Sequence, residues 1–167
     1  DQIENKVTGK TMAAFEPAID YCVVKIPRWP FDKFATGDRH IGTQMKATGE
    51  VMAIDRTFEA ALQKAVRSLE VGGKSLLWED QDWVKNSVVL WPSDLRLWAI
   101  MAAMRRGTTP EEISIQTGID RWFTQKLYGL IKMEQRLLGE TLTPQLLREA
   151  KRLGFSDIQI ATLADRL

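Results

Sequence analysis

The C-terminal part of the sequence repeats one pattern that strongly limits how it can fold. From Pro92 onward, a capping residue, a run with apolar residues three or four positions apart, and a glycine follow one another several times. Thr109, for example, precedes the run PEEISIQT, and Gly118 follows it. A capping hydroxyl accepts a hydrogen bond from a free N–H group at the start of a helix, and glycine readily ends one. The pattern therefore predicts an all-helical bundle of about five helices.

The helices of this bundle are expected within residues 92–107, 109–118, 120–139, 143–154 and 156–167. The first is expected to bury Leu95, Trp98, Ile100, Met101 and Met104 on its apolar face. The third is expected to bury Trp122, Leu127, Leu130, Ile131, Met133 and Leu137. The segments TPEEISIQTGIDRWF and TPQLLREAKRLGFSDIQI are weakly similar, which indicates either shared helix-hairpin chemistry or an internal duplication.

The first 70 residues have a mixed pattern. The predicted elements are the end of a helix over residues 1–10, strands over 18–27 and 44–54, and a helix over 57–69. The first strand is rich in β-branched and aromatic residues and is expected to stop at Pro27. The second shows apolar and polar alternation, and Asp55 or Thr57 is expected to cap the helix after it. Helix 57–69 carries one apolar face, made of Phe58, Ala61, Leu62, Ala65, Val66 and Leu69.

Residues 72–91 show no sustained period and predict an irregular connection with one short extended run over 87–90. Four of the six tryptophans lie in or near this connection: Trp78, Trp83, Trp91 and Trp98. Aromatic side chains concentrated in this way usually anchor a core or a contact surface. The fold class predicted from these patterns is mainly α, with a small two-stranded β unit before the helices.

Charge and composition exclude several classes of function. The chain has 23 basic and 22 acidic residues, so its overall field gives no general attraction for nucleic acid. It has one cysteine and one histidine, which cannot make an internal disulfide or a Cys/His zinc site. No apolar run is long enough to cross a membrane. We expect a cytoplasmic protein that is a piece of a longer chain, because the sequence has no initiating methionine and no signal-peptide core.

Residues that could carry chemistry occur in contexts that do not support it. GGKS at 72–75 lacks the glycine, the preceding strand and the following helix of a phosphate-binding loop. His40 has no nucleophile in a recognisable setting and is interpreted as a solvated loop residue. Cys22 is interpreted as a buried, inert core residue. The acidic residues Glu79, Asp80 and Asp82 could contact Mg²⁺, but a solvated loop is the favoured interpretation.

Residues 109–131 leave open an alternative function as a helix-turn-helix module that binds nucleic acid. Two helices are expected there, separated by Gly118, which is the spacing of such a motif. The second helix begins with Asp120, Trp122 and Phe123 instead of residues that read bases, and two glutamates in the first helix would repel phosphates. Helix packing is therefore the favoured interpretation.

Four segments resemble the large chain of carbamoyl-phosphate synthetase, in the same order. They are EPAIDYCVVKIPRW at 16–29, TQMKATGEVMAIDRTFEAALQKAVRSLE at 43–70, IDRWF at 119–123 and LLREAKRLGFSDIQIATL at 146–163. The resemblance covers nearly the whole sequence and is weakest over residues 72–92. It implies that residues 1–70 are the end of the first ATP-grasp domain, which forms carboxyphosphate, and that residues 71–167 are the helical oligomerisation domain.

The resemblance also implies what this chain lacks. The family's large chain, an ATP-dependent ligase, uses ATP, bicarbonate and glutamine-derived ammonia to make carbamoyl phosphate for pyrimidine and arginine biosynthesis. Its nucleotide ligands and the Glu-x-Asn pair that holds Mg or Mn lie upstream of Asp1, so no catalytic, cofactor or metal residue is carried over. Met45 would line the passage that conveys carbamate, or would simply be a core methionine. The implied partners are the other domains of the same large chain, a glutaminase subunit or domain, and further copies in a homo-oligomer, with no nucleic acid and no membrane.

Overall fold

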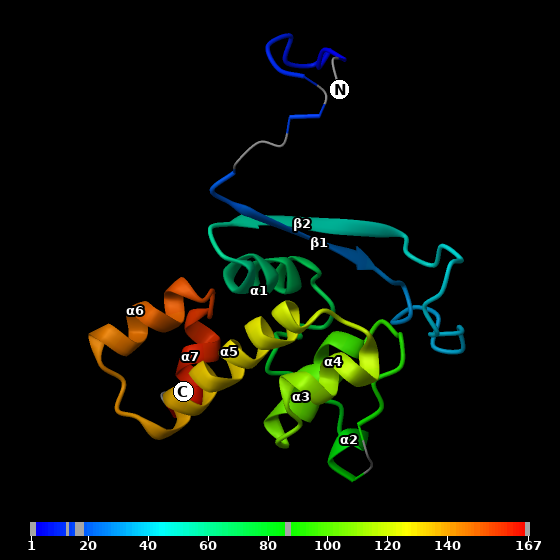
Figure 1. The fold of residues 1–167 in the computed structure, drawn as a ribbon. Coiled ribbons are helices and arrows are strands. Elements are labelled where there is room, and N and C mark those ends of the chain that lie inside the picture. The colour runs from blue at the N-terminus through cyan, green and yellow to red at the C-terminus, as the bar shows by residue number, and fades with distance from the viewer. Residues whose placement is uncertain (1–2, 13, 16–18, 86–87, 166–167) are drawn as a thin grey trace.

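The computed structural model describes residues 3–12, 14–15, 19–85 and 88–165, and places a small sheet on a helical bundle (Figure 1). The described strands are β1 (Cys22–Arg28) and β2 (Gly49–Asp55). The described helices are α1 (Phe58–Ser68), α2 (Asp82–Lys85), α3 (Arg96–Arg105), α4 (Pro110–Thr117), α5 (Arg121–Gly139), α6 (Pro144–Arg152) and α7 (Asp157–Leu163). The mainly helical fold with a preceding two-stranded sheet is confirmed.

The two strands pair antiparallel, with Val24 opposite Ala53 and Arg28 opposite Gly49. Side chains alternate between the two faces, so Val24, Ile26 and Val51 point toward the helices. Pro27 lies inside β1 and does not end it, since in a two-stranded sheet each strand has one edge where a missing N–H is tolerated. β1 therefore runs one residue beyond its predicted end.

Helix α1 lies between the sheet and the rest of the bundle (Figure 1). The Thr57 side chain accepts a hydrogen bond from the backbone N–H of Ala60, which confirms Thr57 as the N-cap. The predicted apolar face is buried apart from Phe58, which is half-buried. This face packs against β1 and β2, and α1 also contacts α5, so α1 joins the sheet to the bundle.

The five C-terminal helices begin and end largely where the capping residues predict. Thr109, Thr143 and Ser156 each accept a hydrogen bond from the backbone N–H three residues later. Gly118 ends α4 in the left-handed conformation, with a φ of 71°. The apolar residues expected in α3 and α5 form the core, except for Leu95, which is half-buried, and Trp122, half of whose surface is exposed.

Several predicted boundaries are wrong. Residues 3–12 form turns and one bridge between Glu4 and Met12, not the end of a helix, because Ile3 and Val7 are exposed and have no core to pack against. Residues 44–48 are a loop before β2. Residues 19–21 are not part of a strand, and residues 1, 2 and 18 lie outside the described residues.

The segment before α3 also differs from the prediction. α3 begins at Arg96 and not near Pro92, because residues 92–94 contact the loop before β2. The N–H of Ile41 donates to the carbonyl of Pro92, and Arg39 forms an ion pair with Asp94. The short helix α2 lies inside the connection expected to be irregular. Residues 88–90 form no strand, and residue 87 lies outside the described residues.

Candidate functional site

The structure separates the residues that the sequence marks as chemically interesting. Among the described residues, no three or more His, Cys, Asp or Glu side chains lie close enough to hold a metal ion. Cys22 is half-buried at the start of β1, so its interpretation as a core residue is wrong. It lies at the end of the sheet, and the strand residue that is fully buried is Ala53.

Met45 lies in the loop before β2, and 88% of its surface is exposed. The interpretation of Met45 as a core methionine on a strand face is therefore wrong. The predicted role in lining a carbamate passage stays a prediction.

His40 is exposed, as expected, and its ring stacks on Trp91 with centroids 5.6 Å apart. Lys46 holds the same loop through Nζ, which lies 2.7 Å from Asp38 Oδ2 and 2.6 Å from the carbonyl oxygen of His40. These contacts attach the loop to the segment before α3. Ser93 lies opposite His40 in an isolated β-bridge, but within the described residues no hydrogen bond joins their side chains.

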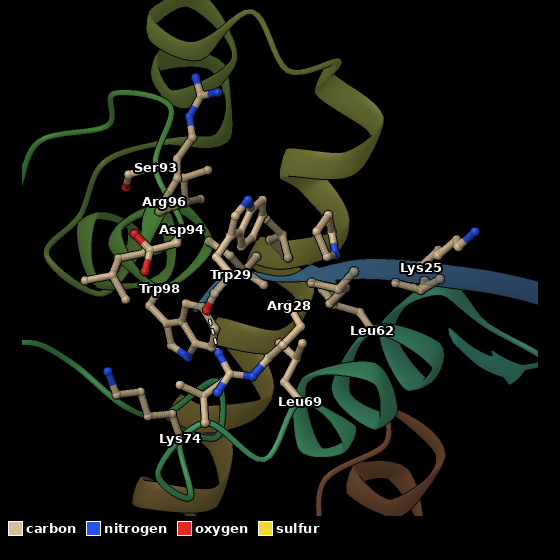
Figure 2. A pocket seen from close by; sticks show the side chains of 18 of the residues that line it. Lys25, Arg28, Trp29, Leu62, Leu69, Lys74, Ser93, Asp94, Arg96 and Trp98 are labelled. Carbon is tan, nitrogen blue, oxygen red and sulfur yellow. Dashed lines mark hydrogen bonds between the residues drawn. The ribbon is translucent and has the colours of Figure 1, made fainter. Parts of the chain in front are cut away.

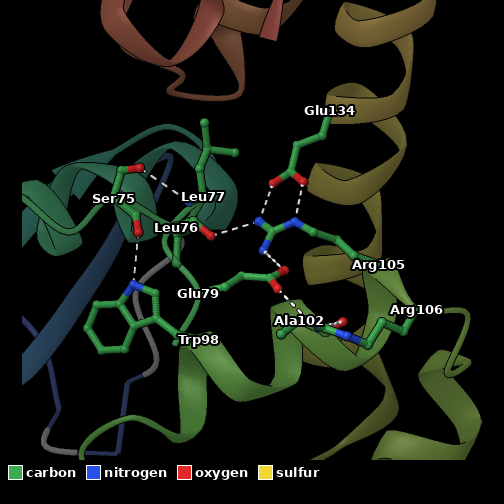
Figure 3. A network of polar contacts seen from close by, with 9 residues as sticks. All are labelled: Ser75, Leu76, Leu77, Glu79, Trp98, Ala102, Arg105, Arg106 and Glu134. Carbon is green, nitrogen blue, oxygen red and sulfur yellow. Dashed lines mark hydrogen bonds and ion pairs between the residues drawn. The ribbon is translucent and has the colours of Figure 1, made fainter. Parts of the chain in front are cut away.

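A partly buried polar network centres on Arg105, at the end of α3 (Figure 3). Nε of Arg105 donates to Glu134 on α5 at 2.7 Å, and one terminal nitrogen donates to the other Glu134 oxygen at 2.8 Å. The other terminal nitrogen donates to Glu79 at 3.0 Å. The carbonyl of Leu76 accepts a hydrogen bond of 2.7 Å from the terminal nitrogen that also donates to Glu134. Arg106 donates to the second Glu79 oxygen at 2.6 Å. Glu79, expected in a solvated acidic loop, is thus bonded to two arginines.

The pKa values in this network follow from burial and charge. Burial lowers the pKa of Arg105, but hydrogen bonds and attraction from Glu134 and Glu79 outweigh it, and the pKa lies above its ordinary value. Burial raises the pKa of Glu79, while hydrogen bonds from Arg105 and Arg106 lower it by more, so the net shift is downward. Both groups are therefore ionised at neutral pH. The network has the chemistry of a structural clasp between residues 76–79, α3 and α5.

Sequence reasoning missed this clasp, although one signal was available. Glu134 follows Leu127 and Leu130 by seven and four positions, which puts its carboxylate on the apolar face of α5. A carboxylate in that position needs a cation, and Arg105 ends a helix whose residues 97–104 are all apolar. Residue spacing within a helix does not show which arginine lies close to Glu134, because α4 separates α3 and α5 in the sequence.

A cluster of tryptophans lies beside the clasp. The rings of Trp78 and Trp83, and those of Trp78 and Trp98, meet edge to face with centroids 5.6 and 6.3 Å apart. Nε1 of Trp98 donates to the carbonyl of Ser75 at 2.9 Å. Trp98 lies in the core and Trp78 and Trp83 pack against it, so the prediction that these tryptophans anchor a core is confirmed for three of the four, while Trp91 is 42% exposed. The connection between α1 and α3 reaches the clasp through Leu76 and Glu79.

A cavity of about 360 Å³ lies between β1, α1, α3 and α5 (Figure 2). Its walls are mainly apolar and include Ile26, Leu62, Leu69, Trp98 and Leu127. Its size falls in the range of small-molecule sites, which also combine apolar walls with a few polar groups.

The turn between α4 and α5 carries a second group of aromatic residues. Trp122 and Phe123 contact each other and Phe58 of α1, with ring centroids 5.0–5.5 Å apart. Arg121 forms an ion pair with Glu111. The first turn of α5 is thus occupied by contacts within the chain, which disfavours its use for reading nucleic acid bases.

The outer face of the sheet is also apolar. Val23, Met52 and Ile54 are exposed on it, and Lys25 pairs with Glu50 at 2.9 Å beside them. No described helix covers this face, since α1 lies on the other side (Figure 1). Within the described residues, no helix is both long and apolar enough to span a bilayer.

Comparisons with known proteins agree on one family. A family model described as "Carbamoyl-phosphate synthetase large chain, oligomerisation domain" matches residues 50–166. The chain is 64% identical over 167 residues to the carbamoyl phosphate synthase large chain of Thermomicrobium roseum, covering 98% of this chain and 16% of that protein. It is 48% identical over 184 residues to the "Carbamoyl phosphate synthase large chain, N-terminal section" of Methanopyrus kandleri, covering 98% of this chain and 32% of that protein.

Proposed function

The chain belongs to the carbamoyl-phosphate synthetase large-chain family, and from that premise we propose that it is a structural part of a carbamoyl phosphate-forming ligase. In this proposal the parent protein uses ATP, bicarbonate and ammonia from glutamine, and this piece links its catalytic halves and mediates self-association. The chain spans only 16% of the large chain of Thermomicrobium roseum, so the activity belongs to the longer protein.

The clasp around Arg105 is the observation that carries this proposal. The hydrogen bonds and ion pairs of Arg105 hold residues 76–79 against α3 and α5, and Glu134 is only 4% exposed. Groups held in this way are unavailable to a substrate. They fix the connection between α1 and α3 against the bundle, which suits a link between two catalytic parts.

The remaining features of the proposal follow from the family. The division at residue 70 would separate the end of an ATP-grasp domain from the oligomerisation domain, with α1 packed on both the sheet and α5. ATP and Mg or Mn would bind elsewhere in the parent. The partners would be the other domains of the large chain and a glutaminase subunit or domain. A cytoplasmic setting is supported by the single cysteine, which has no partner for an internal disulfide.

Self-association is tested by light scattering of the 167-residue chain over a dilution series. We expect a discrete dimer or tetramer that persists at low micromolar concentration. A monomer at all concentrations would contradict the self-association role and leave only the linking role.

Two variants distinguish helical association from artificial pairing through the exposed sheet. Met52→Glu places a carboxylate opposite Lys25 on the outer sheet face, where it forms a favourable cross-strand pair and makes the face polar. Trp122→Gln removes an exposed aromatic anchor from α5. The proposal expects Met52→Glu to leave the oligomer intact. Loss of the oligomer in Met52→Glu alone would assign the association to the sheet and contradict it.

Calorimetry tests the absence of nucleotide binding. We expect no saturable heat when ATP and Mg²⁺ are titrated into the chain. Saturable binding in the micromolar range would overturn the view that this piece is a scaffold.

A further inference from the structure

The cavity between β1 and the helices is shaped to hold an apolar group. Its volume of about 360 Å³ equals roughly twelve water molecules in the liquid, but its walls offer few partners for their hydrogen bonds. Ile26, Leu62 and Trp98 line the cavity (Figure 2), so an apolar occupant gains contacts that water does not.

Two of the cations that line the cavity, Arg96 and Lys74, form no ion pair among the described residues. Three of the charged residues that line it already have opposite partners: Lys25 with Glu50, Arg28 with Asp32, and Asp94 with Arg39. Arg96 directs its guanidinium away from the cavity and donates to the carbonyl of Thr117 at 2.9 Å. Lys74 has no carboxylate partner among the described residues.

The position of Lys74 makes this cation available. Lys74 is one of the residues that line the cavity, and its Nζ lies 3.7 Å from the centre of the Trp78 ring, which is outside that lining. Lysine carries its charge on a flexible stem with rotatable donors, so the ammonium can turn to an anion at the edge of the cavity. We propose that this cavity binds a small amphipathic anion, with an apolar chain or ring between β1, α1, α3 and α5 and its carboxylate at Lys74.

This inference is independent of the proposed scaffold function and is tested on the 167-residue chain with three probes of equal length. They are octanoate, octan-1-ol and octylammonium, titrated while the indole N–H signals of Trp29 and Trp98 are followed by NMR. Octanoate should shift both signals and bind about three- to tenfold more tightly than octan-1-ol, because its charge is attracted to a partly exposed cation. Octylammonium should bind less tightly than the alcohol. Added salt should reduce these differences.

Two matched lysine variants decide whether Lys74 is the recognising group. Lys74→Gln should remove the preference for octanoate over octan-1-ol while leaving the alcohol's affinity nearly unchanged. Lys132→Gln is the control, since Lys132 also lies over an aromatic ring, 5.0 Å from the centre of Tyr128, but does not line the cavity.

Two results would overturn the proposal. The first is an octanoate preference that survives Lys74→Gln. The second is a folded wild-type chain to which none of the three probes binds. The second result would indicate that an apolar side chain from another segment of the longer protein fills the cavity.

Discussion

Replacing Arg105 with methionine is predicted to lower the free energy of unfolding by about 3–5 kcal/mol. The guanidinium makes four hydrogen bonds, two of them to Glu134, and the methionine can make none. Glu79 keeps its bond to Arg106 after the change, but Glu134 is left as an unpaired carboxylate that is only 4% exposed. The cost is therefore mainly that of a buried charge without a partner.

A double variant tests this reasoning. Arg105→Met with Glu134→Leu removes both charges and fills the space with apolar atoms, which is often neutral or stabilising for a buried ion pair. The double variant should therefore be more stable than Arg105→Met alone, even though the carbonyl of Leu76 also loses its donor.

The control is Arg136→Met, because Arg136 also pairs with two glutamates, Glu140 and Glu149, but 41% of its side chain is exposed. That change should cost much less than Arg105→Met, because exposed ion pairs contribute little to stability. Urea unfolding followed by circular dichroism measures the stability of the wild type and of the three variants. Their unfolding midpoints are compared, provided that the dependence of the unfolding free energy on urea has the same slope. The reasoning is refuted if Arg105→Met costs no more than Arg136→Met, or if the double variant is the least stable of the set.

Three further predictions concern other parts of the fold. Trp98→Ala should cost about 3–5 kcal/mol in urea unfolding, because the ring is 5% exposed in the core; a cost below about 1 kcal/mol would contradict its core position. Gly154→Ala should destabilise the chain more than Gly72→Ala. Both glycines have positive φ, but only at residue 154 would the new Cβ lie 2.8 Å from Ala60 Cα. Equal losses of stability would argue against this close packing. The depressed pKa of Glu79 contributes stability that is present above its unfolded pKa of about 4.3 and lost as the pH falls through its lower folded pKa. The stability difference between wild type and Glu79→Gln should therefore shrink in acid, and a difference that grows would contradict the assignment.

The helical part of the fold could be predicted well because its ends are set by local chemistry. A Thr or Ser hydroxyl and the backbone N–H three residues later are enough to fix where α4, α6 and α7 begin. The sheet could be predicted only in part. Residues 44–48 alternate like a strand, but Met45 has no neighbouring element to bury it, and pairing begins only at Gly49. A strand is defined by its partner, which local sequence does not specify.

The clasp and the cavity could not be predicted because both depend on which elements come together. Glu79 is polar and lies in a segment with no period, which suits a solvated loop equally well. Its two arginine partners follow by 26 and 27 positions, and Glu134 reaches the same guanidinium from another helix. The cavity is lined by four elements at once, and no spacing within one of them indicates an empty volume.

The two similar helix hairpins show the same division between local and tertiary causes. In both, a threonine caps a helix that has proline in its first turn, and Gly118 and Gly154 follow with positive φ. The buried positions differ, however. The first helix buries Ile113, four residues after its cap, whereas the second buries Leu146 and Ala150, three and seven residues after its cap. Helix-end chemistry accounts for the features that the hairpins share, and packing accounts for those that differ, so the similarity requires no duplication.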